Sequence, residues 1–370
     1  MKQTHGRVVH VESLAEVDRR LAAGASRIGS WRVHHLDLTE HGERLLACRV
    51  TGAAFLGCTF APGDDDALVA AGALVLPTVG STPLDVYRPR LYSPDELYDR
   101  TPYLRTLDAR AYAWAQRVPG RDDTLAAALH DHAVGEALGA WVAGRRVVGV
   151  MGGHALQRGD AGYADAVRLG WLLGRDAVVA TGGGPGAMEA ANLGGRLAGQ
   201  DDAAVRSALD ALAPVPSFRP SIDDWVRTAR EAVADLPARD GLGVPTWHYG
   251  HEPPNLFATA IAKYVANATR EAVLLEVCTA GIVFLPGAAG TVQEVFQDAC
   301  ENYYADESSV APMVLVGRAH WTGTLPAWPL LQALARGRAM EQHVHLVDTV
   351  EEAAAIIAGP DPLPAVPGRP

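Results

Sequence analysis

The chain has 370 residues, a length that allows one large core and an additional smaller domain. Of these residues, 48% are hydrophobic and 20% are charged, which is typical of a globular protein. Its formal net charge of −11 argues against sequence-independent nucleic-acid binding, because no surplus of cations can neutralise phosphates. No apolar run reaches the roughly 18 residues of a membrane span, and Met1–Glu12 has no apolar signal-peptide stretch. We therefore expect a cytoplasmic protein without a membrane partner.

Residues 1–105 are predicted to form a small N-terminal domain of mixed or β character. The segments Trp31–Leu38 and Leu46–Phe60 alternate in polarity and are interrupted by glycine and proline, which is typical of short strands. Residues 106–145 have a helical pattern and are predicted to connect this domain to the next one. No internal repeat is evident that would change this interpretation.

Residues 146–358 alternate between short buried strands and amphipathic helices. The expected strands are Val147–Met151, Ala177–Ala180, Gly281–Leu285, Met313–Val316 and Val344–Val347. The expected helices include Tyr163–Leu173, Ala187–Leu197 and Val292–Tyr303. Because strands that alternate with helices form right-handed crossovers, this part of the chain predicts an α/β fold with a Rossmann-like, doubly wound parallel sheet.

A polar segment, Asp201–Gly243, interrupts this alternation and contains two predicted helices, at Val205–Leu212 and Ile222–Leu236. It is long for a crossover, and such segments often form a lid or an interface. We expect it to cover the base side of a ligand pocket or to pack on a partner subunit; the alternative is a surface insertion without function. The proline-rich residues 359–370 are predicted to be a disordered tail.

Two glycine-bearing loops follow the first two strands of this core. The first loop, after Val147–Met151, contains Gly152, Gly153 and His154. The second opens the helix Ala187–Leu197 and contains Gly182, Gly183, Gly184, Gly186, Met188 and Glu189. Consecutive glycines expose backbone N–H groups, and the N-terminus of the following helix favours negative charge, so the second loop predicts an anion site. A tight turn is the alternative explanation of both loops.

A third loop, Pro286–Glu294, follows the strand Gly281–Leu285 and contains Gly287, Gly290 and Thr291. Thr291 and Glu294 also match a capping box, which requires no function. The carboxyl ends of parallel strands share one edge of the sheet, so all three loops are expected to converge on one crevice. The carboxylate of Glu294 would then lie close to a bound anion.

These motifs, taken in order, resemble the Lonely Guy family of phosphoribohydrolases, which were formerly labelled lysine decarboxylases. Gly182–Met188 matches the G-G-x-x-G-x-M loop of that family, and Pro286–Glu294 resembles its P-G-G-x-G-T-x-x-E motif. Met151–His154, Thr181–Glu189 and Glu252–Asn255 are especially similar to the bacterial nucleotide 5′-monophosphate nucleosidases of the family. The resemblance covers about Arg146–Val316, under half of the chain.

The resemblance implies that Glu294 and Arg270 form the catalytic pair. Two departures stand out: Ala288 replaces the second glycine of the motif, and the spacing from Arg270 to Pro286 is one residue longer than usual. A surface arginine paired with a neighbouring acid is the alternative for Arg270.

The implied activity is hydrolysis of the N-glycosidic bond of a nucleoside 5′-monophosphate, which gives a free base and ribose 5-phosphate. The resemblance implies no cofactor, and it implies a homodimer or a higher homo-oligomer. One alternative is a non-catalytic nucleotide sensor, which Ala288 favours. Another is a protein that binds a different phosphorylated ligand, such as a molybdenum cofactor, on the same fold.

No metal site or disulfide is expected. The cysteines Cys48, Cys58, Cys278 and Cys300 form no C-x-x-C pair. The H-x-H pairs His130/His132 and His343/His345 have no third and fourth ligand nearby in the sequence.

Overall fold

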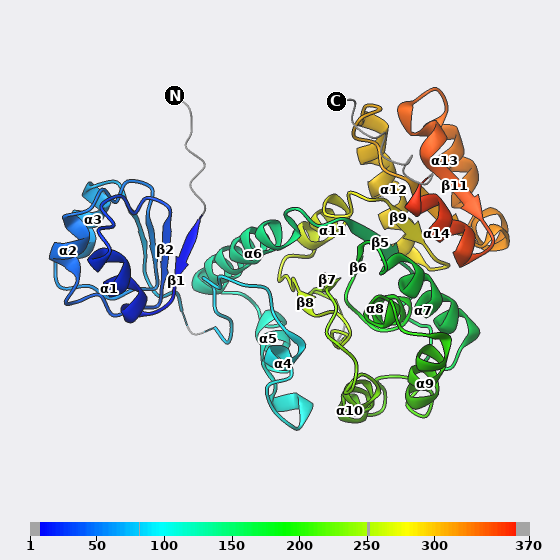
Figure 1. Ribbon diagram of the computed structural model, residues 1–370, viewed down its shortest axis with the longest axis horizontal. Helices are drawn as coiled ribbons and strands as arrows, with labels where there is room; N and C mark the ends of the chain where they lie inside the picture. Colours follow the sequence, from blue (N-terminus) through cyan, green and yellow to red (C-terminus); the bar gives the residue numbers. More distant parts are fainter. Residues whose placement is uncertain (1–7, 81, 250–251, 360–370) are drawn as a thin grey trace, which may run out of the picture. The chain divides into compact units, whose positions relative to one another are not determined.

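A computed structural model describes residues 8–80, 82–249 and 252–359 (Figure 1). The chain divides into two compact units. The first unit comprises the described residues through Arg90 together with Arg117–Ala137. The second comprises Leu91–Gln116 and the described residues from Leu138 onward. The predicted tail falls outside the described residues except for Gly359.

The first unit is a repeated strand–helix element. Its parallel strands, in sheet order, are β1 (Val9–Val11), β2 (Trp31–His34), β3 (Ala54–Leu56) and β4 (Leu74–Leu76). The helices between them are α1 (Leu14–Ala22), α2 (Gly42–Leu46) and α3 (Asp64–Ala70). Paired positions lie 22 residues apart from β1 to β2 and from β2 to β3, and 20 residues apart from β3 to β4. The sequence analysis did not detect this structural repeat.

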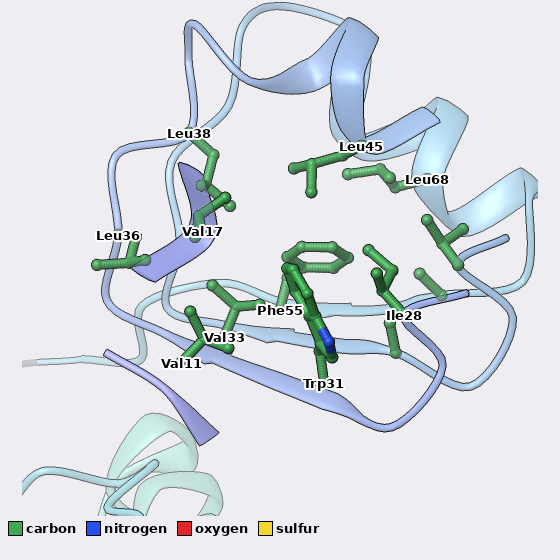
Figure 2. Close-up of a cluster of buried hydrophobic side chains, with 13 residues drawn as sticks. Val11, Val17, Ile28, Trp31, Val33, Leu36, Leu38, Leu45, Phe55 and Leu68 are labelled. Carbon is green, nitrogen blue, oxygen red and sulfur yellow. The ribbon is translucent and has the colours of Figure 1, made fainter. Parts of the chain in front are cut away.

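The core of this unit lies between the sheet and its helices (Figure 2). Val11, Val33 and Phe55 are paired neighbours on adjacent strands and are fully buried. Figure 2 shows Phe55 beneath Leu45 and Leu68, which come from α2 and α3. Equivalent positions therefore hold side chains of different size, which explains why the repeat is hard to see in the sequence.

The segment Leu91–Gln116 belongs to the second unit, although residues 1–105 were expected to form one domain. It contains α4 (Pro94–Leu97), the 3-10 helix η1 (Tyr103–Arg105) and α5 (Leu107–Ala115). The carboxylate of Asp108, which is fully buried, accepts hydrogen bonds from Lys263 Nζ at 2.7 Å and Trp247 Nε1 at 2.9 Å. Removing one member of such a buried pair leaves an uncompensated charge, so the pair fixes α5 to this unit.

The long helix α6 (Arg121–Val142) follows α5, and its residues through Ala137 belong to the first unit. The predicted helical connector, residues 106–145, therefore consists of α5 and α6 and contributes to both units. The contacts of Asp108 explain why α5 belongs to the second one.

The second unit contains a seven-stranded parallel sheet in the order β11-β10-β9-β5-β6-β7-β8 (Figure 1). The strands are β5 (Val147–Met151), β6 (Val178–Thr181), β7 (Gly241–Gly243), β8 (Ala260–Ile261), β9 (Ile282–Phe284), β10 (Met313–Val316) and β11 (Val344–Val347). β5 is the first strand of this sheet in the sequence. The strands β6, β7 and β8 follow in order on one side of it, and β9, β10 and β11 follow in order on the other side. This order confirms the predicted Rossmann-like, doubly wound parallel sheet.

Helices connect these strands. They are α7 (Ala161–Leu173), α8 (Ala187–Leu197), α9 (Asp202–Leu212), α10 (Ile222–Ala232), α11 (Asn267–Glu276), α12 (Ala289–Tyr304), the π-helix η2 (His320–Thr324), α13 (Ala327–Ala335), the 3-10 helix η3 (Ala339–His343) and α14 (Val350–Ala358). The predicted strands and helices of this unit agree with the structure to within a few residues. The polar segment leads into the short strand β7, after which Thr246 forms an isolated parallel bridge with Tyr264.

Close packing of α7 against α8 depends on glycine. A Cβ atom at Gly170 of α7 would lie 2.1 Å from the carbonyl oxygen of Ala191, and one at Gly194 of α8 would lie 2.0 Å from that of Val167. Both distances are far below van der Waals contact, so any side chain at either position would push the helices apart. The two glycines therefore fix α8, and with it the loop that precedes α8.

We predict that Phe55→Ala lowers the free energy of unfolding of the first unit by about 3–5 kcal/mol, because it leaves a cavity in the centre of the core. Leu74→Ala is the matched control, since this side chain on β4 is 53% exposed. Its replacement is expected to change stability by less than about 0.5 kcal/mol. Urea denaturation followed through hydrogen exchange of the β2 and β3 amides compares the two variants. Equal, small losses would contradict the central position of Phe55.

Candidate functional site

The candidate site lies where the strand order of the large sheet reverses. The first strand, β5, has β6 on one side and β9 on the other. Loops after these three strands contain Gly152–His154, Gly182–Gly186 and Pro286–Thr291. In open parallel sheets the carboxyl ends of strands at such a switch point form the ligand crevice. The structure thus brings the three predicted loops to one edge, and Gly153 N donates to Pro286 O at 3.2 Å.

Buried side-chain amides hold the loop after β6. Thr181 Oγ1 donates to Asn192 Oδ1 at 2.7 Å and accepts from Gly183 N at 3.0 Å. Asn255 Nδ2 donates to Asn192 Oδ1 at 3.0 Å and to Gly184 O at 3.2 Å. All three side chains are buried, where unpaired polar groups are costly. The network therefore fixes one loop conformation. Asn192 was missed by the sequence analysis, although an amide within a helix of small residues was a signal for it.

Two glycines of this loop allow close approach of other groups. A Cβ atom at Gly182 would lie 2.3 Å from Arg270 Nη2 and 2.7 Å from Met188 Sδ. Gly183 has a φ of +73°, and a Cβ atom there would lie 2.7 Å from Pro245. The loop is consequently buried beneath these side chains. Met188 therefore packs over the loop.

At the N-terminus of α8, backbone carbonyls lie close to the expected anion site. Ala187 N donates to Gly153 O at 3.1 Å, and a Cβ atom at Gly186 would lie 2.6 Å from the carbonyl oxygens of Gly153 and His154. Backbone carbonyls thus cover this helix end. Gly152 is also required for packing, because a Cβ atom there would lie 2.9 Å from that of Ala187.

The loop after β9 is open by comparison. Ala288, Ala289 and Gly290 are exposed, and α12 begins at Ala289 without a side-chain cap. The first N–H groups of a helix have no intrahelical acceptor, so this end is available to an anion. The capping box predicted from Thr291 and Glu294 is wrong, because Thr291 lies inside the helix and not at its N-cap.

Ala288 itself fits the loop. Its φ is −122°, a value that alanine adopts without the strain that a positive φ would impose. Gly287 has a stricter requirement, since a Cβ atom there would lie 2.2 Å from Thr291 Oγ1. Gly290 has open space at its Cβ position.

Arg270 and Glu294 lie together above these loops. Arg270, on α11, donates through Nε to Val244 O at 2.7 Å and through Nη2 to Gly182 O at 3.4 Å. Its Nη1 lies 3.8 Å from Glu294 Oε1, and the two side chains are 12% and 14% exposed. This guanidinium is therefore fixed by the backbone and turned toward the carboxylate. It is not the solvated surface residue considered as an alternative.

The environment of Glu294 favours its protonated form. Burial raises the pKa of Glu294 to about 7, while the Arg270 charge lowers it and the neighbouring Glu271 raises it. Glu271, which the sequence analysis missed, is held as an acceptor by Asn267 Nδ2 at 2.7 Å and Gln293 Nε2 at 2.6 Å. The crevice thus contains a carboxyl group that changes charge near neutral pH.

Glu189 is committed to a different partner. It lies in the first turn of α8, is 1% exposed, and is paired with Arg158, whose Nε lies 3.0 Å from Glu189 Oε1. Burial raises the pKa of Glu189, and the Arg158 charge opposes that shift. Arg158 was also missed, because its partner lies 31 positions away and no short motif contains both residues.

A pocket of about 380 Å³ adjoins the loop after β6. Pro185 and Gly186 line one side of it, and His154 and Glu252 line another. The long connection before β7 closes the rest, mainly through Phe218. His154 is largely exposed, and its Nδ1 lies 3.8 Å from Glu252 Oε1. The volume falls within the roughly 300–1,000 Å³ of small-molecule sites.

The described residues contain no cluster of three or more metal-ligating side chains, and none of their helices is long and apolar enough to cross a membrane. His130 is buried on the helix α6, where its Nδ1 lies 2.9 Å from Asp131 Oδ1. Within the same described residues the four cysteines are free.

No family model and no curated protein matches the sequence. Among solved structures, the chain is similar to the molybdenum cofactor binding protein from the phototrophic bacterium Rippkaea orientalis, with 16% identity, a TM-score of 0.37, and coverage of 58% of this chain and 96% of that one. It is also similar to the Moco Carrier Protein from Chlamydomonas reinhardtii, with 18% identity, a TM-score of 0.33 and the same coverage. The Rossmann-like assignment rests on the strand order described above.

We predict that the stability of the protein depends on pH through Glu294. The folded state keeps this proton up to about pH 7, whereas an ordinary glutamate releases it near 4.5. Between these values the folded state binds more protons, so stability falls as pH rises and levels off above the folded pKa. Glu294→Gln removes the part of that decline that Glu294 contributes, whereas Glu307→Gln, at an exposed position, retains it. The pKa of the buried Asp298 is raised to about 8, so this carboxyl group still contributes a decline in both variants. Parallel pH profiles for wild type and Glu294→Gln in thermal denaturation would refute the raised pKa.

Proposed function

We propose that the protein hydrolyses the N-glycosidic bond of nucleoside 5′-monophosphates. The observation that carries this proposal is the mostly buried Arg270–Glu294 pair, which lies at the switch point beside the exposed N-terminus of α12. Arg270 can bind phosphate, and Glu294 can stabilise positive charge on the sugar. The resemblance of the loop motifs to the Lonely Guy family supports the same chemistry.

The phosphate is bound at the loop after β9. Backbone N–H groups of Ala289, Gly290 and Thr291 form the first turn of α12, where the helix dipole favours an anion. The Arg270 guanidinium adds a charged donor. These contacts hold the ribose in a fixed position beside Glu294. Such positioning lowers the entropic part of the activation barrier of hydrolysis.

The reaction consumes one water molecule. As the C1′–N bond breaks, its electrons leave with the base and positive charge develops on the ribose ring. The Glu294 carboxylate stabilises this charge at its side of the sugar and accepts a proton from the attacking water. The oxygen of that water becomes the C1′ hydroxyl. The departing base takes up a proton from solvent, and Glu294 returns the proton of the water to solvent. The products are ribose 5-phosphate and the free base.

The shifted pKa of Glu294 suits this role. A group with a pKa of about 7 is partly ionised at neutral pH, so it can both accept and release a proton during a cycle. The positive charge of Arg270 lowers the pKa of Glu294, so part of the Glu294 population is ionised at neutral pH. Ala288 favoured the alternative of a non-catalytic sensor, but its φ of −122° shows that alanine fits this loop without a positive φ.

We predict that Glu294→Gln lowers kcat for nucleoside monophosphates by about 10²-fold or more, because the amide can neither carry the charge nor accept the proton. Glu307→Gln, an exposed acid, is the matched control and is expected to retain activity. Free base released from a panel of nucleoside monophosphates is measured by chromatography. Activity within about threefold of wild type would contradict the catalytic role of Glu294. Binding of nucleotide without turnover in the wild-type protein would identify a binding protein instead.

We also predict that the 5′-phosphate is required. Adenosine lacks the anion that pairs with Arg270 and the α12 amides, and each hydrogen bond to a charged group contributes about 1.5–3 kcal/mol. Its kcat/KM is therefore expected to be at least about 10²-fold lower than that of AMP. Comparable values for adenosine and AMP would refute the phosphate site and indicate a nucleosidase that acts on unphosphorylated substrates.

A further inference from the structure

The pocket beside the loop after β6 is formed in large part by the connection between α8 and β7. Pro216, Ser217, Phe218, Arg219 and Trp225 of this connection line it. They belong to the turn between α9 and α10 and to the first turn of α10. A connection that encloses a pocket at the switch point has a position that suits ligand binding.

The connection is fixed to the core by a buried guanidinium. Arg158 is 2% exposed and is paired with Glu189 of α8. Its Nη1 donates to Trp225 O at 3.3 Å, and its backbone N donates to Pro216 O at 3.0 Å. The guanidinium also lies 4.9 Å from the centre of the Trp225 ring, within cation–π range. The floor of the pocket is therefore rigid before any ligand binds.

The lining combines an aromatic side chain and a guanidinium with other polar groups. The Phe218 ring packs edge-on against Trp225 at 6.5 Å, and the Arg219 guanidinium lies 5.5 Å from the centre of the Phe218 ring. Planar guanidinium and aromatic groups both stack on nucleobases. Gln157 and Glu252 stand at the edge of the pocket. A carboxylate can only accept hydrogen bonds, so Glu252 selects a ligand edge that carries N–H donors.

Two contacts connect the lining of this pocket with residues next to the candidate catalytic groups. Glu252 Oε2 lies 3.4 Å from the Cβ position of Gly184, two residues along the loop from Gly182, which contacts Arg270. Tyr249 also lines the pocket, and its hydroxyl donates to Glu271 at 3.1 Å, beside Arg270 in the sequence. A sugar held at Arg270 and Glu294 can therefore extend its base along the loop into the pocket.

We propose that this pocket binds the base of the nucleotide, with Phe218 and Arg219 on its face and Glu252 accepting hydrogen bonds from its edge. Among the common bases, guanine presents two adjacent N–H donors to a carboxylate, whereas hypoxanthine presents one of them and adenine presents only its amino group. The proposal rests on the proposed function for the position of the sugar, and it assigns GMP as the preferred substrate.

The test is calorimetric binding in a Glu294→Gln background, which prevents consumption of the ligand. Phe218→Ala is expected to weaken GMP binding by about tenfold, the value of one base–aromatic stack, and to leave ribose 5-phosphate binding unchanged. Glu252→Gln is expected to reduce the preference for GMP over IMP by about tenfold, the value of one charged hydrogen bond. Arg206→Ala, at an exposed arginine on α9, is the matched control for Arg219→Ala.

The outcomes separate this inference from the proposed function. Loss of GMP affinity in Phe218→Ala with unchanged ribose 5-phosphate affinity supports the base pocket even if the wild-type protein releases no free base. GMP affinities within about twofold of each other in all variants overturn the base pocket, whether or not wild type hydrolyses GMP. Equal weakening of GMP and ribose 5-phosphate by Arg219→Ala also overturns it, because the pocket would then hold the phosphate.

Discussion

The guanidinium of Arg270 joins the carboxyl ends of three strands, and the geometry of the site depends on it. Its two backbone acceptors are Gly182 O, after β6, and Val244 O, after β7, and its remaining nitrogen faces Glu294 on the helix after β9. The guanidinium has five N–H donors in one plane, so it can reach these three acceptors at once. The single ammonium group of a lysine could not do so. Glycine at position 182 is required because the guanidinium occupies the space of a side chain.

Buried charges also determine which segments accompany the large sheet. Arg158 with Glu189 fixes the connection that contains α9 and α10, and Lys263 with Asp108 fixes the segment that contains α5. All four side chains are almost fully buried. A buried ion pair stabilises little in comparison with an apolar contact, but a partner that is lost leaves an uncompensated charge. The pairs therefore specify one arrangement of two segments that a purely apolar surface would position less strictly.

The apolar strands, the helices between them and the glycine loops could be predicted from the sequence, whereas β7 and the side-chain pairs between distant positions could not. β5 and β10 are buried apolar runs, and β11 is apolar except for His345; the predicted bounds of all three agree with the structure. β7 is Gly-Leu-Gly and gives no such signal. The loops of the site could be predicted because glycine motifs are local. Arg158 and Glu271 could not, because their roles depend on partners brought together only by folding.

The first unit has a property that the large sheet lacks. Each of its strands pairs only with the strand before and after it in the sequence, so β1 and β4 share no hydrogen bond. The stability of such a linear stack is approximately a sum over neighbouring repeats. Evolution can therefore add or delete one strand–helix element at the expense of a single interface, whereas the same change in the centre of the large sheet would remove β5, on which both halves are built. We expect the length of this unit to vary among related chains while the seven-stranded sheet keeps its strand order.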